Sequence, residues 1–145
     1  MVRRTSLSTP PAGASQADVA GMLRAAGVRP TRQRQQLARL LFDGSDKHVT
    51  AEQMYEAAKQ QSVPMALATV YNNLHQFTAA GLLRQVTVDA GCVYFDTHTG
   101  VHHHFYDTQT GQLTDVSSTE VKVEQLPSPP EGRSISQVDI IIRLR

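Results

Sequence analysis

Apolar residues in the first half of the chain recur every three or four positions, which is the spacing of an amphipathic helix. This pattern predicts four helices between residues 16 and 83. The apolar positions of the first, second and fourth are Val19, Met22, Leu23 and Ala26, then Leu37, Leu40 and Leu41, then Leu67, Val70, Leu74 and Phe77. The third helix is predicted in "HVTAEQMYEAAKQ".

Local signals mark where these helices begin and end. Gly27 and Gly81 are typical helix stops, and the second helix is expected to begin after Pro30–Thr31 and to stop near Gly44. Thr50 and Gln53 have the spacing of a capping box, which predicts that the third helix begins near Thr50.

After the fourth helix, the pattern changes to short β-rich runs. "LLRQVTV" and "CVYFD" are joined by "DAG", which predicts a hairpin with a tight turn. Helices followed by such a hairpin form a winged helix-turn-helix, which we place at residues 16–97. That module puts one helix into the major groove of DNA.

The last part of the chain, residues 98–145, predicts a small α/β unit. "VHHHFYD" and "GQLTDVS" form a second hairpin, a short helix follows at about residues 118–126, and "PSPPEG" ends it. "SISQVDIIIRL" predicts a closing strand, whose run Ile140–Ile142 is too apolar for an open edge. We therefore expect pairing with a second copy, so the fold class is α+β, a winged helix-turn-helix followed by a dimerisation domain.

Composition changes this picture little. The chain has 145 residues with 40% apolar and 19% charged, which is enough for a buried core. Residues 1–15 are rich in Ser, Thr, Pro, Ala and Gly, which predicts a disordered arm. No membrane-spanning run and no secretory signal are evident, so we expect a cytoplasmic protein without a membrane partner. The single Cys92 excludes an internal disulfide and a four-thiolate zinc site.

The net charge of +1 hides an asymmetry between the two ends of the chain. Residues 1–45 carry seven arginines against two aspartates, whereas residues 84–145 carry five basic and eight acidic groups. A basic end favours binding to a polyanion. The alternative is a chance division of solvated surface charge.

The fourth predicted helix has an unusual polar face. No Asp, Glu, Lys or Arg occurs from Gln60 to Leu83. Tyr71 lies at the margin of the apolar face, and the opposite face holds Ala68, Thr69, Asn72, Asn73 and Gln76. Amides can bond adenine in a bidentate way and methyl groups pack on thymine methyls, so this face suits base edges. The alternative is a helix wedged between others, with its amides satisfied internally.

The histidine triplet is the candidate for metal chemistry. Alternation along a strand puts His102 and His104 on one face and His103 on the other. The first two could share a cation with ligands from elsewhere, for which the candidates are Asp96, Asp115 and His48. A mixture of imidazoles and carboxylates suits Zn²⁺, Fe²⁺ or Mn²⁺. The alternative is a polar strand edge with solvated histidines.

From about Ala25 to Val116, the sequence resembles the ferric uptake regulator (Fur) family. The motifs that carry the resemblance are "GVRPTRQRQQLARLL", "HVTAEQMYEAA", "LATVYNNLHQF", "GLL" and "HHHFYDTQTGQL". The resemblance implies a dimeric winged-helix repressor that responds to metal and binds a palindromic operator. Its sensory site would fall on His48, Asp96, His102, His104 and Asp115, and its DNA contacts would include Arg29 and Arg34.

Departures from the family narrow the expectation. The first Cys-x-x-Cys pair of many members reads Asp107 and Thr110 here, and no second pair is present, so we expect no structural cysteine-type zinc. A further family site reads Val101, His103, Lys122 and Val138 here, so it is expected to be lost. The triplet and the missing cysteines look most like the iron response regulator (Irr) branch, which implies haem binding at His102, His103 and His104.

The sequence thus favours a DNA-binding regulator, mainly a repressor, of iron and haem metabolism, with haem and one divalent metal as cofactors. The DNA-binding residues would be Arg29, Arg34, Ala68, Thr69, Tyr71 and Asn72. A peroxide-sensing, metal-dependent repressor of the same family is the alternative. A metal-dependent hydrolase is disfavoured because no Glu lies near the triplet and five protein ligands leave little room for an activated water. A metal store would not need the uncharged helix face.

Overall fold

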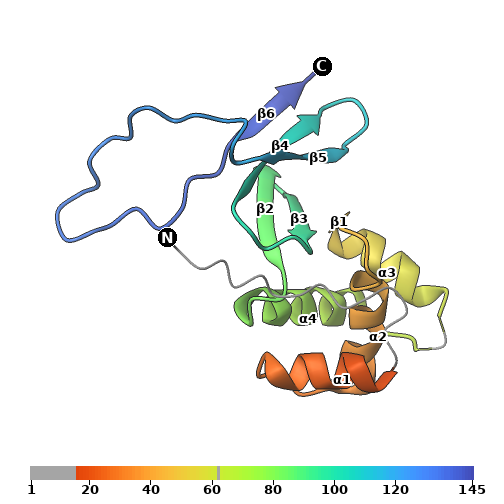
Figure 1. Cartoon of the computed structure of the whole chain (residues 1–145). Helices are drawn as coiled ribbons and strands as arrows, with labels where there is room; N and C mark the ends of the chain where they lie inside the picture. The colour runs from red at the N-terminus through yellow and green to blue at the C-terminus, as the bar shows by residue number, and fades with distance from the viewer. Residues whose placement is uncertain (1–15, 62) are drawn as a thin grey trace. The chain divides into compact units, whose positions relative to one another are not determined.

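A computed structural model describes residues 16–61 and 63–145 (Figure 1). The disordered segment predicted at residues 1–15 lies outside the described residues. The chain divides into two compact units, the first ending at Thr99 and the second comprising Gly100–Arg145. Each unit is described by itself.

The first unit begins with two helices, α1 (Gln16–Ala25) and α2 (Arg32–Leu41). The predicted stop after α1 is confirmed, since Gly27 has a φ of 78°, a left-handed backbone conformation that glycine adopts without a Cβ clash. Thr31 is the N-cap of α2, and its side chain accepts a hydrogen bond from the Arg34 amide at 3.3 Å.

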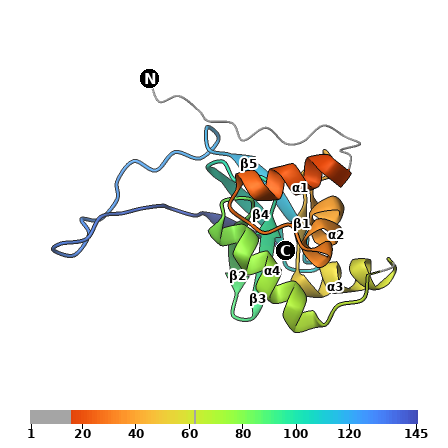
Figure 2. The same cartoon turned by 90° about the horizontal axis from the view of Figure 1, so that it is seen from below.

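The next two helices are α3 (Ala51–Lys59) and α4 (Leu67–Ala79). The predicted capping box at α3 is confirmed. The Gln53 amide donates to Thr50 Oγ1 at 3.1 Å, and the Thr50 amide donates to Gln53 Oε1 at 3.0 Å. Helix α2 contacts both α1 and α3, and α3 contacts α4 (Figures 1 and 2).

A three-stranded sheet completes the first unit. Its strands are β1 (His48–Val49), β2 (Arg84–Asp89) and β3 (Cys92–Asp96), in the order β1-β3-β2 with antiparallel pairing. The predicted hairpin is therefore present as β2–β3. The two-residue β1 was not predicted, because so short a strand leaves no alternation to recognise. It places His48 opposite Asp96 in the register.

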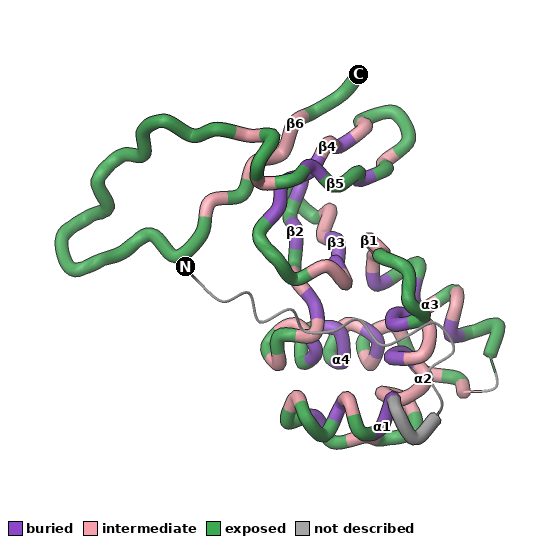
Figure 3. The backbone as a smooth tube through the Cα atoms, in the orientation of Figure 1, coloured by how far each residue is buried: buried purple, intermediate pink, exposed green. Residues whose placement is uncertain are grey.

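The core of the first unit lies where the apolar faces of the four helices meet β3. Buried and exposed positions alternate along each helix at the spacing that the sequence predicts (Figure 3). The largest fully buried apolar side chains are Leu23, Leu37, Leu41, Leu74, Phe77 and Phe95.

The second unit is built on a three-stranded sheet. Its strands are β4 (His102–Asp107), β5 (Leu113–Ser117) and β6 (Ile141–Leu144), in the order β5-β4-β6. Strand β4 is antiparallel to β5 and parallel to β6. The predicted second hairpin is thus present, and the predicted closing strand is shortened to its last residues.

A hydrogen-bonded turn joins β4 to β5. The Asp107 carboxylate accepts bonds from the amides of Gln109 at 2.8 Å and Thr110 at 3.1 Å, which lowers the pKa of Asp107. Thr108 donates through both its amide and its hydroxyl to the carbonyl of Leu144. The position of the family's first cysteine pair therefore holds a turn that is tied to β6 by hydrogen bonds.

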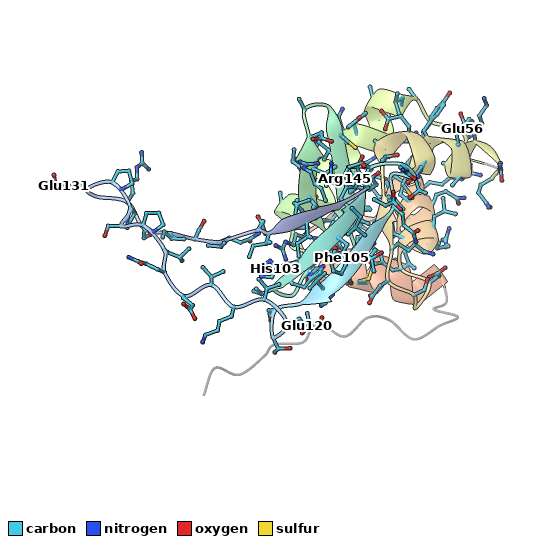
Figure 4. All side chains as sticks on the ribbon, turned by 90° about the horizontal axis from the view of Figure 1, so that it is seen from above. Glu56, His103, Phe105, Glu120, Glu131 and Arg145 are labelled. Atoms are coloured by element: carbon cyan, nitrogen blue, oxygen red, sulfur yellow. The ribbon has the colours of Figure 1, made fainter. Side chains whose placement is uncertain are left out.

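The helix predicted at residues 118–126 is wrong. Residues 118–120 form a turn, and residues 121–139 contain neither helix nor strand (Figure 1). Val121 and Val123 alternate with charged residues, which is the period of a strand and not of a helix, and Pro127 disfavours a helical conformation of the residue before it, Leu126. We call residues 121–139 the arm; Glu131 lies at its tip in Figure 4.

Candidate metal centre and nucleic-acid interface

Helix α4 presents the uncharged face that the sequence predicts. Val70, Leu74 and Phe77 are buried, whereas Ala68 and Asn72 are exposed. Thr69 and Tyr71 are half-buried at the margin of the exposed face. Small and amide side chains on an exposed face fit the donors, acceptors and methyl groups of base edges.

Two of the amides expected on that face do not have the predicted environment. Asn73 is buried, with 7% of its surface exposed, and its Oδ1 accepts a bond from Arg34 Nε at 3.0 Å. Gln76 is exposed, but its Oε1 accepts a bond from the same guanidinium. The prediction that Asn73 faces outward is therefore wrong, because this amide has a charged donor on α2.

Tyr71 is also held by a neighbouring helix. Its hydroxyl donates to Glu52 Oε1 on α3 at 3.0 Å, and its ring stacks with that of His75 at a centroid distance of 6.2 Å. The carboxylate stabilises the protonated hydroxyl, so the pKa of Tyr71 is raised. The hydroxyl is thus a donor with a fixed direction.

The basic residues that were predicted to contact DNA differ in their surroundings. The Arg29 residue is exposed, in the loop between α1 and α2. The Arg34 guanidinium lies between α2 and α4 and donates to Arg29 O at 3.0 Å as well as to the two amides of α4. This cluster could not be recognised in the sequence, since the partners of Arg34 lie 5 to 42 residues from it along the chain.

The first unit brings together two of the predicted metal ligands. His48 Nε2 lies 3.2 Å from Asp96 Oδ2, as the register of β1 and β3 requires. The other carboxylate oxygen of Asp96 accepts a bond from the His98 amide at 2.8 Å. The Asp96 side chain is fully buried, and a buried carboxylate requires a charged or hydrogen-bonding partner.

The second unit brings together the other three. Asp115 Oδ1 lies 3.2 Å from His102 Nε2 and 3.4 Å from His104 Nε2. The two imidazole rings are 4.5 Å apart between centroids, so the predicted alternation of the triplet is confirmed. His102 and His104 are both buried. Nitrogen and oxygen ligand atoms thus converge on one point.

The hydrogen bond at the far side of His102 determines which atom is available for a cation. His102 Nδ1 lies 2.6 Å from the carbonyl of Gly100, and a carbonyl can only accept, so Nδ1 carries a proton. A neutral His102 then turns the lone pair of Nε2 toward the Asp115 oxygen. Two acceptors face each other there, and a proton or a metal cation between them removes the repulsion. This donor set therefore fits a divalent metal.

His103 has the opposite arrangement. Its Nδ1 accepts a hydrogen bond from the Ile140 amide at 3.2 Å, so the proton of the neutral ring lies on Nε2. The nitrogen that remains has no lone pair for a metal unless the bond to Ile140 breaks. His103, which is labelled in Figure 4, therefore joins β4 to Ile140, the residue that precedes β6.

Comparison with known proteins shows the family. The model of the ferric uptake regulator family matches residues 25–143. This chain belongs to that family. Its members are metal-responsive transcription regulators that bind DNA, and the α+β fold with a winged-helix DNA-binding domain and a small dimerisation domain agrees with this membership.

Individual relatives point to two regulatory types. The ferric uptake regulation protein of Pseudomonas fluorescens is 35% identical over 104 residues, which cover 71% of this chain and 85% of the relative. The peroxide-responsive repressor PerR of Staphylococcus epidermidis is 36% identical over 105 residues, which cover 72% of this chain and 69% of the relative. Neither relative is described as an iron response regulator.

Solved structures agree with the fold. The ferric uptake regulator of Pseudomonas aeruginosa, solved with manganese, is 27% identical with a TM-score of 0.65, covering 86% of this chain and 95% of its own. The regulator of Francisella tularensis, solved with iron, has a TM-score of 0.68 at 21% identity, covering 82% of this chain and 92% of its own, and shows the fold alone.

The faces of the triplet, together with the tautomers of His102 and His103, predict how single substitutions affect metal binding. We expect His102→Ala and His104→Ala to weaken Mn²⁺ binding at least about tenfold, because each removes a ligand nitrogen. His103→Ala is the matched control and should keep the wild-type affinity. Isothermal titration with Mn²⁺ measures all three, and equal losses in the three variants would contradict this assignment.

Proposed function

We propose that this regulator represses genes of iron and haem metabolism and responds to iron or haem through its histidines and aspartates. The observation that carries the proposal is the convergence of His102, His104 and Asp115 on one point with two acceptors face to face. Such a cluster is stable when it holds a cation. No catalytic step follows from it, so we propose no enzymatic activity.

We propose that one divalent ion, Mn²⁺, Fe²⁺ or Zn²⁺, binds to the five residues His48, Asp96, His102, His104 and Asp115. The pair His48–Asp96 in the first unit and the group of His102, His104 and Asp115 in the second support this set. The resemblance of the five positions to the sensory site of the family supports it as well. The ion would supply the positive charge that two carboxylates and three neutral imidazoles require. No cysteine contributes, so we do not propose a structural cysteine-type zinc.

The DNA interface that we propose is the exposed face of α4 with the basic loop before α2. Its residues are Arg29, Arg34, Ala68, Thr69, Tyr71 and Asn72. Its partner is double-stranded DNA with a palindromic operator, in the cytoplasm. Among the described residues, no helix is long and apolar enough to cross a membrane.

Fluorescence anisotropy tests the function directly. The probe is a palindromic duplex selected from a random pool by the wild-type protein, and the comparison is a scrambled duplex of the same composition. We expect a preference for the selected duplex that changes with added Mn²⁺ or haem. A protein that binds both duplexes equally in every state would contradict the proposal.

Substitution of α4 residues tests the interface. We expect Tyr71→Ala and Asn72→Ala each to cost about 1 to 3 kcal/mol of affinity for the selected duplex, if their side chains reach base edges. Ala79→Ser, at the exposed C-terminal end of the same helix, is the matched control. Anisotropy titrations measure the loss, and unchanged affinity in both variants would remove α4 as the recognition helix.

We also propose that the protein is a homodimer joined through residues 100–145. The arm supports this, because Val123, Leu126 and Ile135 each leave 46% of their surface exposed in a single copy. The β6 strand contributes the half-buried Ile141 and Ile142 to an edge of the sheet. Apolar side chains on an arm and an edge strand are typical of a surface that a second copy covers.

The combined variant Val123→Ser/Leu126→Ser tests the dimer. We expect its dimer dissociation constant to rise at least about tenfold, because two apolar side chains lose their burial. Lys122→Ser/Glu124→Ser, at the two arm positions on either side of Val123, is the matched control. Sedimentation equilibrium measures both. A monomeric wild type would contradict the dimer, and an unaffected arm variant would exclude the arm from the interface.

For haem, we propose that it competes with the metal by binding His102 or His104. The bond from Ile140 to His103 Nδ1 supports this choice, because His103 would have to give up that bond to offer a ligand nitrogen. The effect on DNA follows if haem changes the equilibrium between conformations, since a ligand acts only through its different affinity for each.

A competition titration tests the haem proposal. The protein is loaded with Mn²⁺ or Zn²⁺, haem is added, and metal release is followed together with the Soret band. We expect the metal to leave in step with haem binding. Full haem binding with the metal retained, abolished in His103→Ala, would place haem on the other face of β4 and contradict the proposal.

The relative from Staphylococcus epidermidis favours a second candidate, a peroxide-responsive repressor. In that case, peroxide and bound Fe²⁺ would oxidise a ligand histidine. Mass spectrometry of peptides that contain His48 and His102, after treatment with Fe²⁺ and peroxide, distinguishes the two. Added oxygen on these peptides at low peroxide concentration would favour this candidate over the iron and haem regulator.

A further inference from the structure

The Arg34 guanidinium joins three parts of the first unit. Its Nε donates to Asn73 Oδ1 at 3.0 Å, one terminal nitrogen donates to the carbonyl of Arg29 at 3.0 Å, and the other donates to Gln76 Oε1. Each nitrogen of the fork thus has an acceptor within the protein. A side chain that only neutralised a phosphate would need none of these bonds.

The two bonds to α4 fix the rotation of this helix about its axis. Asn73 and Gln76 are three residues apart, so they lie on the same side of the helix, about one turn from each other. One planar group that contacts both leaves the helix little freedom to roll. Asn72, next to Asn73, faces solvent, so its direction depends on the same rotation.

The third bond fixes the loop that carries Arg29. The carbonyl of Arg29 accepts from Arg34 and also from the Thr31 amide at 2.9 Å. Gln35 Nε2 donates to the carbonyl of Pro30 at 2.8 Å. The loop before α2 is therefore held at two successive carbonyls. The Arg29 residue is exposed, and its carbonyl is bonded to the same guanidinium that holds α4.

We propose that Arg34 is a positioning residue that sets how well the regulator discriminates between DNA sequences. Its bonds to Asn73 and Gln76 set the rotation of α4, and its bond to Arg29 sets the path of the basic loop. This inference rests on the proposed role of α4 in DNA recognition. It differs from the other role that a basic residue at a DNA interface can have, which is a direct contact with a phosphate.

The two roles predict different behaviour of the charge-conserving variant Arg34→Lys. A phosphate contact needs only a positive charge, which lysine supplies. A positioning role needs the planar fork, because one ammonium group cannot reproduce three bonds in fixed directions. Discrimination between sequences requires base contacts to be aligned, whereas phosphate contacts contribute equally to all sequences.

The experiment measures the affinities of the full-length protein for the selected palindromic duplex and the scrambled duplex over a range of salt concentrations. The variants are Arg34→Lys, Arg34→Gln and Gln76→Ala. Arg32→Gln is the matched control, an exposed arginine on the same helix for which the structure gives no partner on α4. Arg29→Gln is the reference for a phosphate contact.

We expect Arg34→Lys to lower the ratio of the two affinities about tenfold, which is the effect of one charge-assisted hydrogen bond, and to leave the salt dependence unchanged. Arg34→Gln and Gln76→Ala should both lower the same ratio. The double variant Arg34→Gln/Gln76→Ala should lower it no further than Arg34→Gln alone, because the bond lost in Gln76→Ala is one of the three lost in Arg34→Gln. Arg32→Gln should keep the wild-type ratio. Arg29→Gln should reduce the slope of log affinity against log salt concentration by about 0.9, while the ratio of the two affinities stays similar to that of the wild type.

Two results together would overturn the proposal in favour of a phosphate contact. The first is a wild-type ratio of the two affinities in Arg34→Lys. The second is an equal loss of affinity for both duplexes, with a smaller salt slope, in Arg34→Gln. Equal losses on both duplexes that follow a loss of thermal stability would also overturn it, because they indicate a purely structural role. If Arg34→Lys does not fold, Gln76→Ala decides by the same ratio.

A measurement without DNA separates this inference from the proposed function. Hydrogen exchange should speed up in α4 and in residues 28–31 of Arg34→Lys relative to Arg32→Gln, since those segments lose their anchor. Unchanged exchange would overturn the positioning role. If exchange is faster but the protein does not prefer the selected duplex, Arg34 still holds α4 and the loop before α2. That result would overturn only the role of α4 in DNA recognition.

Discussion

Strand β4 is hydrogen-bonded on both sides, and the chemistry of the second unit depends on this constraint. A central strand must alternate its side chains between two faces while its backbone is shared by two neighbours. His102 and His104 therefore point to Asp115 together, and His103 points away and accepts a bond from Ile140. His102 and His103 thus acquire different tautomers, and the three consecutive histidines divide into two roles.

The difference between the tautomers comes from what lies behind each ring. A carbonyl behind His102 forces the proton onto Nδ1 and leaves Nε2 as a ligand, whereas an amide behind His103 does the reverse. Metal affinity is set by such outer partners as much as by the ligands themselves. The backbone around β4 accordingly leaves Nε2 of His102 available to a cation and occupies Nδ1 of His103.

Much of the fold could be predicted from the sequence because its signals are local. The stop at Gly27, the capping box at Thr50 and the two hairpins depend on residues a few positions apart. The short strand β1 has no period to detect. The helix expected at residues 118–126 failed because the alternation of Val121 and Val123 with charged residues, together with Pro127, outweighs helical propensity.

Part of the candidate site could likewise be predicted from local sequence signals, and part could not. Alternation alone separated His102 and His104 from His103. The ends of neighbouring strands and the residue before the third helix offered Asp96, Asp115 and His48 as partners, and the resemblance implied the same residues. The burial of Asn73 could not be predicted, because its cause is a guanidinium 39 residues earlier in the chain. A periodic pattern places an amide on a helix face but does not show which long side chain from another helix reaches that face.

The basic charge of the N-terminal end does not by itself show which arginine contacts DNA. A local excess of arginines favours a polyanion partner, but charge and contact are different properties. Arg34 donates to two amides and a carbonyl, and Arg39 donates to Gln35 Oε1 at 3.4 Å. Neither loses its charge by these bonds, so both still attract DNA at a distance. Their side chains are nevertheless held by the protein, and the exposed Arg29 is better placed than either to follow a phosphate. A basic surface can therefore attract DNA through all of its arginines while one of them determines the orientation of the helix that distinguishes sequences.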